Sequence, residues 1–468
     1  MRTMQTAPRT LHTYTVVPAL PEALAPAERL AREGFQVPQS LTDSMGESAG
    51  RLRLFPSAEE QFLTDGGEPY KAGSTLVQAD LAQTLDLISR EGPDAFYKGA
   101  IADKIVADMK DADDYPGDAG LMTREDLAGY KAIWREPLRS EYRDHEIVAM
   151  PPPSSGGIAV IEMLNILEGY DLAKMGQSSA DTLHVISEAE KIAFADREEY
   201  VADPGFVDVP TEELTSKGYA DERRGDIDPE KAATSYEPGD FGRKDKASGG
   251  GDNPEGSTTH LSVIDAEGNA VALTCTIEQS FGSAVVAPGT GFLLNNELTD
   301  FSDPGAANEL EPGKRPRSSI SPTIVVRDGE PILVVGASGG SQIIMGALHA
   351  VVNTVDYGLD PARAIDAERL DAQFPPELIL EDGRVSATAE AELISRGHVV
   401  VSEGEYSDVP LVQAAGVDPK TGERLAATDP RSGGQASTGQ GVAAGLPHTG
   451  GVPLFNGCSV VSGRAAPC

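Results

Sequence analysis

The sequence predicts an α+β fold in which stacked antiparallel sheets are covered by helices. Two observations lead to this prediction. In the first half of the chain, apolar residues recur at intervals of three and four, which is the spacing of helices that bury one face. Beyond residue 257 the period falls to two, and turn residues separate short apolar runs. Strands joined in hairpins, rather than alternating singly with helices, favour antiparallel sheets.

The helical period is clear in four segments of the first half. After them, from about residue 225 to 257, the composition changes to Gly, Asp, Lys, Pro and Ser, which we interpret as an exposed linker. The predicted helices span residues 75–92, 95–112, 156–170 and 179–201.

Two hairpins are expected after the linker. Residues 259–265 and 269–277 alternate apolar and polar side chains around Ala-Glu-Gly. Residues 321–326 and 331–337 flank Arg-Asp-Gly-Glu in the same way, and a helix over residues 341–358 should follow directly.

These changes of period divide the chain into three parts. A helix-rich part covers residues 1–257, a strand-rich part covers residues 258–440, and residues 441–468 form a tail without clear periodicity. We expect the tail to pack poorly, because it shows neither a helical nor a strand pattern.

The charge of the chain excludes some partners. Its 468 residues include 74 acidic and 38 basic side chains, a formal net charge of −36. So acidic a surface repels nucleic acid and anionic membranes, and we expect neither as a partner. The first two dozen residues lack the apolar core of a signal peptide, and no run reaches membrane-spanning length. As written, the chain is expected to be cytoplasmic, with export if a native signal precedes it.

The cysteines and histidines predict neither a disulfide framework nor a metal site. Cys275, Cys458 and Cys468 are few and unevenly spaced, without a zinc-binding pattern. We expect Cys275 to be a small buried hydrophobe and His260 to be structural. The glycine-rich "PPPSSGGIAV" lacks the lysine and the spacing of nucleotide-binding loops, so no cofactor is predicted.

The segment "GSTTHLSVID", residues 256–265, places two threonines where the linker meets a strand. Threonine is a good strand residue, and this alone explains the pair. A threonine hydroxyl becomes a nucleophile when a base lies beside it, and the α-amino group of an N-terminal threonine is such a base. A cut in the linker before Thr258 would create that arrangement.

Other polar groups follow in the strand-rich part. Glu297 and Asp300, three residues apart in "NNELTDF", suit an ammonium ligand or form a solvated acidic turn. Ser318 and Ser319 in "PRSSISPT" offer paired hydroxyls or belong to an ordinary loop.

A pair of glycines separates the second hairpin from its helix. Gly339 and Gly340 in "GASGGSQII" form either a tight turn or a helix start whose amides hold an oxyanion.

The order of these motifs resembles one family. "TTHLSVID", "TCTIEQSFGS", "GFLLNNELTDFS", "KRPRSSISPTIVV" and "GASGGSQII" follow one another as in the γ-glutamyltransferases, also called γ-glutamyl transpeptidases or glutathione hydrolases. Upstream, "MPPPSSGGIAVIEMLNILEGYDL" and "EAEKIAFADREEYVADPGFV" are similar to the large subunit of this family. The resemblance covers roughly residues 25–435.

The resemblance implies a four-layer αββα sandwich of the N-terminal-nucleophile hydrolases. It also implies a precursor that cuts itself between Ser257 and Thr258, giving a large subunit from residues 1–257 and a small subunit from Thr258 onward. Thr258 would then take a γ-glutamyl group from glutathione or a related donor. Water, an amino acid or a peptide would accept it.

The resemblance also implies roles for single residues. Thr276 would support the nucleophile, the acidic pair would hold the donor's α-amino group, and the paired serines would bind its α-carboxylate. The glycine pair would form the oxyanion hole. The residues concerned are Thr276, Glu297, Asp300, Ser318, Ser319, Gly339 and Gly340.

The chain departs from the family pattern at two places. Glu278 stands where many glutathione-cleaving members have asparagine. The segment "TIEQ" around it is similar to bacterial branches that include enzymes acting on poly-γ-glutamate. The chain also has a shorter stretch before "LAPAERLAREGF" than family members have, so part of the N-terminal layer is expected to be missing. The family's carboxylate-binding arginine would align with Met4. The alternatives are therefore an acylase acting on poly-γ-glutamate or glutaryl amides, and a truncated member without activity.

Overall fold

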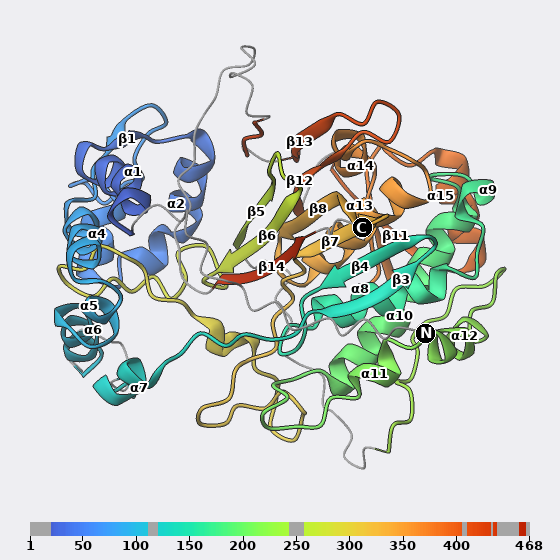
Figure 1. Ribbon diagram of the computed structural model, residues 1–468, viewed down its shortest axis with the longest axis horizontal. Helices are drawn as coiled ribbons and strands as arrows, with labels where there is room; N and C mark the ends of the chain where they lie inside the picture. Colours follow the sequence, from blue (N-terminus) through green and yellow to red (C-terminus); the bar gives the residue numbers. More distant parts are fainter. Residues whose placement is uncertain are drawn as a thin grey trace, which may run out of the picture. The chain divides into compact units, whose positions relative to one another are not determined.

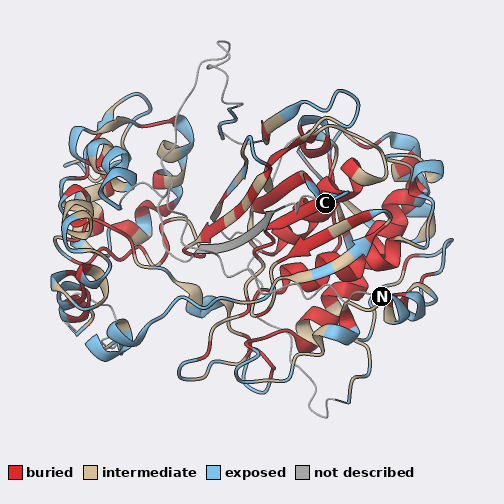
Figure 2. Ribbon diagram, viewed as in Figure 1, coloured by how far each residue is buried: buried red, intermediate tan, exposed pale blue. Residues whose placement is uncertain are grey.

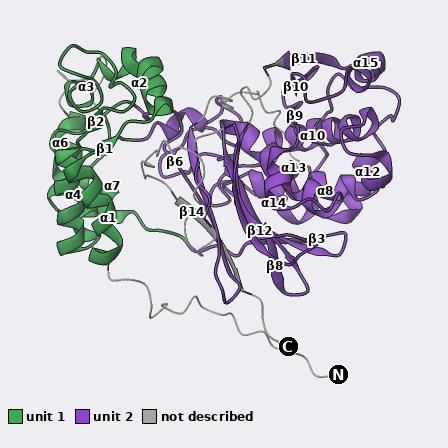
Figure 3. Ribbon diagram, turned by 90° about the horizontal axis from the view of Figure 1, so that it is seen from above, with its two compact units in different colours: residues 1–133, 284–294 green, residues 134–283, 295–468 purple. Residues whose placement is uncertain are grey.

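The computed structural model describes residues 20–110, 120–242, 257–404, 410–431, 434–437 and 458–464. The chain separates into two compact units, residues 1–133 with 284–294 and residues 134–283 with 295–468 (Figure 3). This division does not coincide with the predicted cleavage point after Ser257. The large and small subunits are defined by cleavage of the chain and not by compactness, so this division stays a prediction.

The first unit is mainly helical. The predicted helix over residues 75–92 is confirmed as α4, and the one over residues 95–112 is divided at Gly99, a poor helix former, into α5 and α6. The elements of this unit are α1 (Leu20–Glu33), β1 (Phe35–Gln36), α2 (Gln39–Leu52), α3 (Pro56–Phe62), β2 (Thr75–Leu76), α4 (Ala79–Glu91), α5 (Asp94–Tyr97), α6 (Ala100–Lys110) and α7 (Arg124–Gly129).

The second unit contains a six-stranded antiparallel sheet in the order β13-β12-β8-β7-β4-β3 and a three-stranded antiparallel sheet in the order β14-β6-β5 (Figure 1). Its strands are β3 (Leu138–Tyr142), β4 (His145–Ala149), β5 (Thr258–Ile264), β6 (Asn269–Thr276), β7 (Thr323–Arg327), β8 (Glu330–Ser338), β9 (Leu370–Asp371), β10 (Glu377–Glu381), β11 (Val399–Glu403), β12 (Leu411–Val417), β13 (Arg424–Thr428) and β14 (Cys458–Arg464). Both predicted hairpins are confirmed, as β5–β6 and β7–β8.

The helices of the second unit include the remaining predicted ones. They are α8 (Gly156–Leu167), α9 (Leu172–Met175), α10 (Ala180–Tyr200), α11 (Thr211–Leu214), α12 (Lys217–Arg224), α13 (Ile343–Val355), α14 (Pro361–Asp366) and α15 (Ala387–Arg396). The predicted segments over residues 156–170, 179–201 and 341–358 are confirmed as α8, α10 and α13. All three helices are largely buried (Figure 2), which explains why α8 and α13 carry few charges.

Alternating side chains of the six-stranded sheet build two apolar layers. Ile147 and Val325 pack with residues of α8, α10 and α13 in the main core. Their neighbours Val148 and Ile324 point to the opposite face and pack with Ala272 of the second sheet. The second unit is therefore layered as helices, sheet and sheet, a mixed α/β arrangement that agrees with the predicted stacking of sheets under helices.

Two details differ from the predicted antiparallel arrangement and unstructured tail. β10 and β11 pair in parallel, with α15 as the connection between them, because parallel neighbours need a crossover longer than a hairpin turn. Within the tail, β14 pairs along its whole length with β6, whereas the rest of residues 441–468 lies outside the described residues. A single sheet-edge strand of this kind leaves only a short pattern in the sequence.

The predicted environment of Cys275 is only partly correct. The residue is buried, but it is disulfide-bonded and is not a free thiol. In the pairing of β14 with β6, Cys458 stands opposite Cys275. This proximity results from the register of two strands distant in sequence, which cysteine spacing does not reveal.

His260 is buried between the two sheets of the second unit, as its structural interpretation requires. Its ring nitrogens contact the hydroxyls of Thr274 (2.7 Å) and Ser262 (3.0 Å). Burial lowers the pKa of His260 to about 3, so the ring is neutral at physiological pH. None of the described helices combines the length and apolar composition that a membrane crossing requires.

Candidate active site

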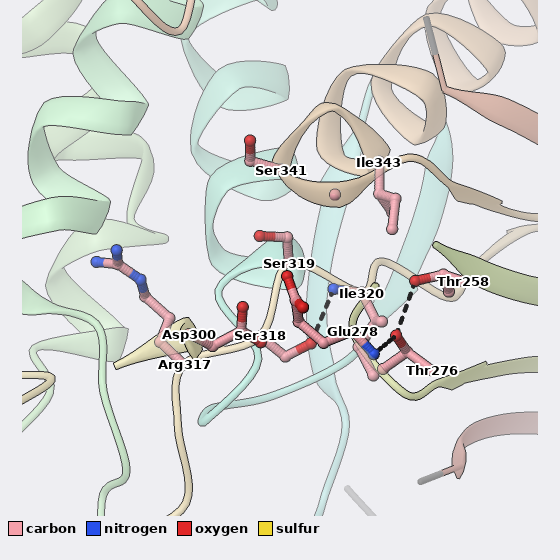
Figure 4. A pocket seen from close by; sticks show the side chains of 11 residues that line it. Thr258, Thr276, Glu278, Asp300, Arg317, Ser318, Ser319, Ile320, Ser341 and Ile343 are labelled. Carbon is pink, nitrogen blue, oxygen red and sulfur yellow. Dashed lines mark hydrogen bonds between the residues drawn. The ribbon is translucent and has the colours of Figure 1, made fainter. Parts of the chain in front are cut away.

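A polar pocket in the second unit brings most of the predicted site residues together (Figure 4). Ser257, Glu297 and Gly339 are not among its lining residues, although each lies near a residue that is. The pocket is lined by Thr258, Thr276, Glu278, Asp300, Arg317, Ser318, Ser319, Ile320, Gly340, Ser341 and Ile343.

The register of the first hairpin places two threonine hydroxyls side by side. Thr258 is the first residue of β5, and it stands opposite Thr276, the last residue of β6. Thr258 Oγ1 donates to Thr276 Oγ1 at 3.0 Å. Thr276 Oγ1 accepts a second bond from the Glu278 amide at 2.9 Å and makes a longer contact, 3.4 Å, to the carbonyl oxygen of Ser257. One hydroxyl therefore contacts both the potential nucleophile and the carbonyl that precedes it.

A turn in the left-handed backbone region directs Glu278 into the pocket. Glu278 has a φ of 75°, which is uncommon for a residue other than glycine. Its side chain is largely buried and accepts a hydrogen bond from the amide group of Asn296. The strained turn allows the same residue to donate its amide to Thr276 and to face the pocket with its carboxylate.

The short helix η1 (Glu297–Asp300) carries the acidic pair. Its tight winding aligns side chains three residues apart, so the two carboxyl groups lie next to each other. Burial raises the pKa of Asp300 to about 8, and the neighbouring Glu297 and Glu278 add to the rise. Burial also raises the pKa of Glu297 to about 7. The pair is therefore partly protonated near neutral pH, and a cation in the pocket would favour its ionised form.

We expect the affinity for an ammonium-bearing donor to rise with pH between about 6 and about 9. The carboxyl groups of Glu297 and Asp300 are neutral below their raised pKa values and charged above them. Only the charged forms attract an ammonium group, so KM should fall as pH increases through this window. The measurement is the pH profile of KM for a γ-glutamyl anilide.

A glutaryl anilide is the matched control substrate, because it differs by lacking the ammonium group. Both substrates depend equally on any titration of the nucleophile, so the difference between their profiles isolates the acidic pair. Asp300→Asn should flatten the difference. Identical KM profiles for the two substrates would contradict the assignment of the acidic pair to an ammonium group.

The paired serines are tied to the start of α8. The Ser155 amide and hydroxyl donate to the carbonyl oxygen of Ser318 at 2.7 and 2.9 Å. Ser154 Oγ donates to the carbonyl oxygen of Ile320 at 2.6 Å. A Cβ at Gly156 would lie 2.1 Å from the Ser321 hydroxyl, so glycine permits this close approach. The "SSGG" motif, which lacks the features of a nucleotide loop and resembles the family's large subunit, braces the serine pair.

Sequence reasoning also missed Arg197 of α10. Its side chain is almost fully buried, and it donates to the hydroxyls of Ser319 (2.8 Å) and Ser155 (2.7 Å). The position of this arginine within the helix predicted over residues 179–201 was the clue, since the helix is buried and a buried charge requires polar partners. Met4, the position aligned with the family's arginine, lies outside the described residues.

The glycine pair forms a turn between β8 and α13. Gly339 has a φ of 127° and Gly340 a φ of 55°. Hydrogen bonds fix the two residues that follow the turn: Ser341 Oγ donates to Gln373 Oε1, and Gln342 Nε2 donates to Asp371 Oδ2 at 2.9 Å. Gly340 faces the pocket, so the backbone at the start of this helix is available to an anion.

One group of described residues has the composition of a metal site, but it lies outside the pocket. It consists of His184, Glu188 and His398, all buried. The two imidazoles bond each other at 2.8 Å, and Glu188 pairs with Lys191 at 2.6 Å. This hydrogen bond and this ion pair explain why the three side chains lie together. That catalysis uses no metal stays a prediction.

Comparison of the fold defines the class of protein. The structure resembles cephalosporin acylase from Bacillus halodurans with a TM-score of 0.80 and 31% sequence identity, over 91% of this chain and 75% of that protein. With a threonine at the head of a strand in the pocket, this likeness defines an N-terminal-nucleophile hydrolase.

Comparison of the sequence identifies the family. The γ-glutamyltranspeptidase profile matches residues 10–439. The chain is 42% identical to the glutathione hydrolase proenzyme of Escherichia coli over 90% of its length, and 41% identical to the acylase ACY 1 proenzyme of Pseudomonas sp. over 82%. The chain therefore belongs to the γ-glutamyltranspeptidase family, as the resemblance implied. It spans 72% of the first relative's length and 65% of the second's, and 61% of that of another relative, the glutathione hydrolase proenzyme of Pseudomonas sp. strain A14.

Proposed function

We propose that the chain is the precursor of a γ-glutamyltransferase and glutathione hydrolase that cuts itself between Ser257 and Thr258. The observation that carries this proposal is the position of the Thr276 hydroxyl. It accepts from Thr258 Oγ1 and contacts the Ser257 carbonyl oxygen. The nucleophile, its proton acceptor and the carbonyl to be attacked are thus already adjacent in the uncut chain.

Self-processing follows from these contacts. Thr258 Oγ attacks the Ser257 carbonyl carbon, the Thr258 hydroxyl proton passes to Thr276 Oγ1, and Thr276 gives its own hydrogen to the Ser257 carbonyl oxygen, with which it is in contact. The bond from this carbon to the Thr258 nitrogen then breaks, the nitrogen takes up a proton, and an ester joins the two residues. Water hydrolyses the ester, which leaves a carboxylate on Ser257 and a free amino group and hydroxyl on Thr258.

The new terminus then performs the transfer reaction. The α-amino group of Thr258 acts as general base for its own hydroxyl, which attacks the γ-carbonyl of the donor. Backbone N–H groups at Gly339 and Gly340 stabilise the oxyanion, and an acyl-enzyme forms as the donor amine leaves. Water then releases glutamate, or an amino acid or peptide accepts the γ-glutamyl group.

The remaining wall of the pocket fits the two charged groups of a γ-glutamyl donor. The carboxylates of Glu278 and Asp300 line the pocket and, together with Glu297 beside Asp300, give a negative region for the α-ammonium group. The hydroxyls of Ser318 and Ser319 face the pocket as donors for the α-carboxylate. We place the donor with its γ-carbonyl at Thr258 and its α-carbon between these two regions.

We also propose that a fourth, helical layer completes the αββα sandwich. The outer face of the β14-β6-β5 sheet exposes apolar side chains, including 51% of Leu261 and 42% of Val263. Such a face is normally covered.

A second candidate function is amide hydrolysis by an acylase. Relatives of comparable identity are named acylase ACY 1, and the cephalosporin acylase has the same fold. An acylase would take a glutaryl group, which has the carboxylate and lacks the ammonium.

Turnover of two anilides separates the candidates. We expect the purified protein to release the chromophore from a γ-glutamyl anilide at least about tenfold faster than from a glutaryl anilide, because only the former engages the acidic pair. Glycylglycine should increase the rate if a peptide accepts the acyl group. Faster cleavage of the glutaryl anilide would support the acylase and overturn the proposal.

A further inference from the structure

Arg197 lies directly behind the serine pair of the pocket. Its side chain is 1% exposed, and it is absent from the pocket lining. Nη2 donates to Ser319 Oγ at 2.8 Å, Nε donates to Ser155 Oγ at 2.7 Å, and Nη1 pairs with Glu198 Oε1 at 2.7 Å. An arginine whose three nitrogens are all engaged is held in one position.

The bond from Arg197 determines how Ser319 can interact with a ligand. A serine hydroxyl has one hydrogen and two lone pairs. Arg197 occupies a lone pair of Ser319 Oγ, and no residue in the described part of the chain accepts the hydrogen. Ser318 Oγ likewise accepts from the Ile320 amide, at 3.3 Å (Figure 4). Two adjacent O–H groups are thus left to donate into the pocket, which is an arrangement for binding a carboxylate.

The same guanidinium also fixes the backbone of the pair. Ser155 Oγ accepts a hydrogen bond from Arg197 Nε and donates one to the carbonyl oxygen of Ser318 at 2.9 Å, so it links the arginine to the backbone of the pair. Arg197 therefore orients Ser319 directly and Ser318 through Ser155. Arg317 also lines the pocket, but its side chain extends away from the threonines (Figure 4), and its Nη2 bonds Glu198 at 2.7 Å.

We infer that Arg197 is a positioning residue that makes the pocket select donors with an α-carboxylate, although its guanidinium does not line the pocket. Its charge polarises the Ser319 hydroxyl, so a ligand carboxylate interacts with the arginine across one hydrogen bond. Lysine should not replace it, since one ammonium group cannot bond Ser319, Ser155 and Glu198 in a planar fork. This inference rests on the proposed function, because it concerns the donor of the same site.

Two ligands test the inference by calorimetric binding to the purified protein. Glutamate has the α-carboxylate, and 4-aminobutyrate has the same chain and ammonium group without it. We expect Arg197→Lys to weaken glutamate binding about tenfold or more and to change 4-aminobutyrate binding less than about twofold. In a Ser319→Ala background, Arg197→Lys should weaken glutamate binding by a smaller factor than in the wild type, because the direct bond to Ser319 is gone and only the contact through Ser155 remains.

Arg223→Lys is the matched control, since Arg223 is another buried arginine of this unit, paired with Asp226 and outside the pocket. It should leave both dissociation constants unchanged. If Arg197→Lys does not fold, Ser155→Ala tests the same set of contacts. It should weaken the binding of glutamate more than that of 4-aminobutyrate. Equal weakening of both ligands, or full additivity with Ser319→Ala, would overturn the role of Arg197 alone. A wild-type protein that does not bind glutamate would overturn the proposed function as well.

Discussion

Replacement of Thr258 by alanine will leave the chain uncut and abolish turnover. The variant has no hydroxyl to attack the Ser257 carbonyl, and its N-terminal amino group is never released. Loss of a nucleophile lowers turnover by on the order of 10⁴-fold or more in comparable enzymes. Denaturing gel electrophoresis of the purified variant should show one chain, and γ-glutamyl anilide turnover should be at background.

Thr259→Ala is the matched control for this experiment. Thr259 is the next residue of the same strand, and it stands opposite Cys275 instead of Thr276. Its side chain points away from the Thr258 hydroxyl, because successive strand residues face opposite sides. We expect this variant to be processed and active. Equal loss of processing in both variants would mean that the substitutions disturb the strand, and would contradict a specific role for Thr258.

Replacement of Gly339 by alanine should lower kcat by about 10²- to 10³-fold, the usual effect of losing one oxyanion donor. Gly339 has a φ of 127°, where L-residues are strained. A Cβ at this position would lie 3.0 Å from the Cα of Pro410, so the turn must move. The donor subsite residues are elsewhere, and KM should change far less than kcat. Steady-state kinetics with the γ-glutamyl anilide measures both constants.

Gly397→Ala separates backbone strain from the loss of oxyanion contacts. Gly397 ends α15 with a φ of 100°, and a Cβ there would meet no atom within 4 Å. The substitution introduces a similar strain at a distance from the pocket, so it should reduce thermal stability and leave kcat unchanged. A Gly339→Ala protein with kcat close to that of the wild type would exclude the glycine turn as the oxyanion hole.

The parts of the structure that the sequence predicts are those with local patterns. The period of two predicts the hairpins β5–β6 and β7–β8, and the helical period predicts α8, α10 and α13. The change of composition before Thr258 predicts that a strand begins there, and the order of the motifs identifies the family. Each of these signals lies within a short stretch of neighbouring residues.

The parts that escaped prediction depend on contacts between distant segments. Arg197 reaches Ser319 across 122 positions, and Ser155 reaches Ser318 across 163. The parallel pairing of β10 with β11 and the addition of β14 to β6 are likewise set by packing. No spacing rule covers such contacts, although an arginine on a buried helix face shows that a polar partner must exist.

The intact mass of the purified wild-type protein tests the central claim most directly. The account predicts two polypeptides, residues 1–257 and residues 258–468, whose masses add up to the 49.1 kDa chain plus one water. This result would show the cut in front of Thr258, since a shift by one residue changes both masses. A single species of 49.1 kDa, or a pair of fragments divided elsewhere, would contradict the account and favour a family member without this activity.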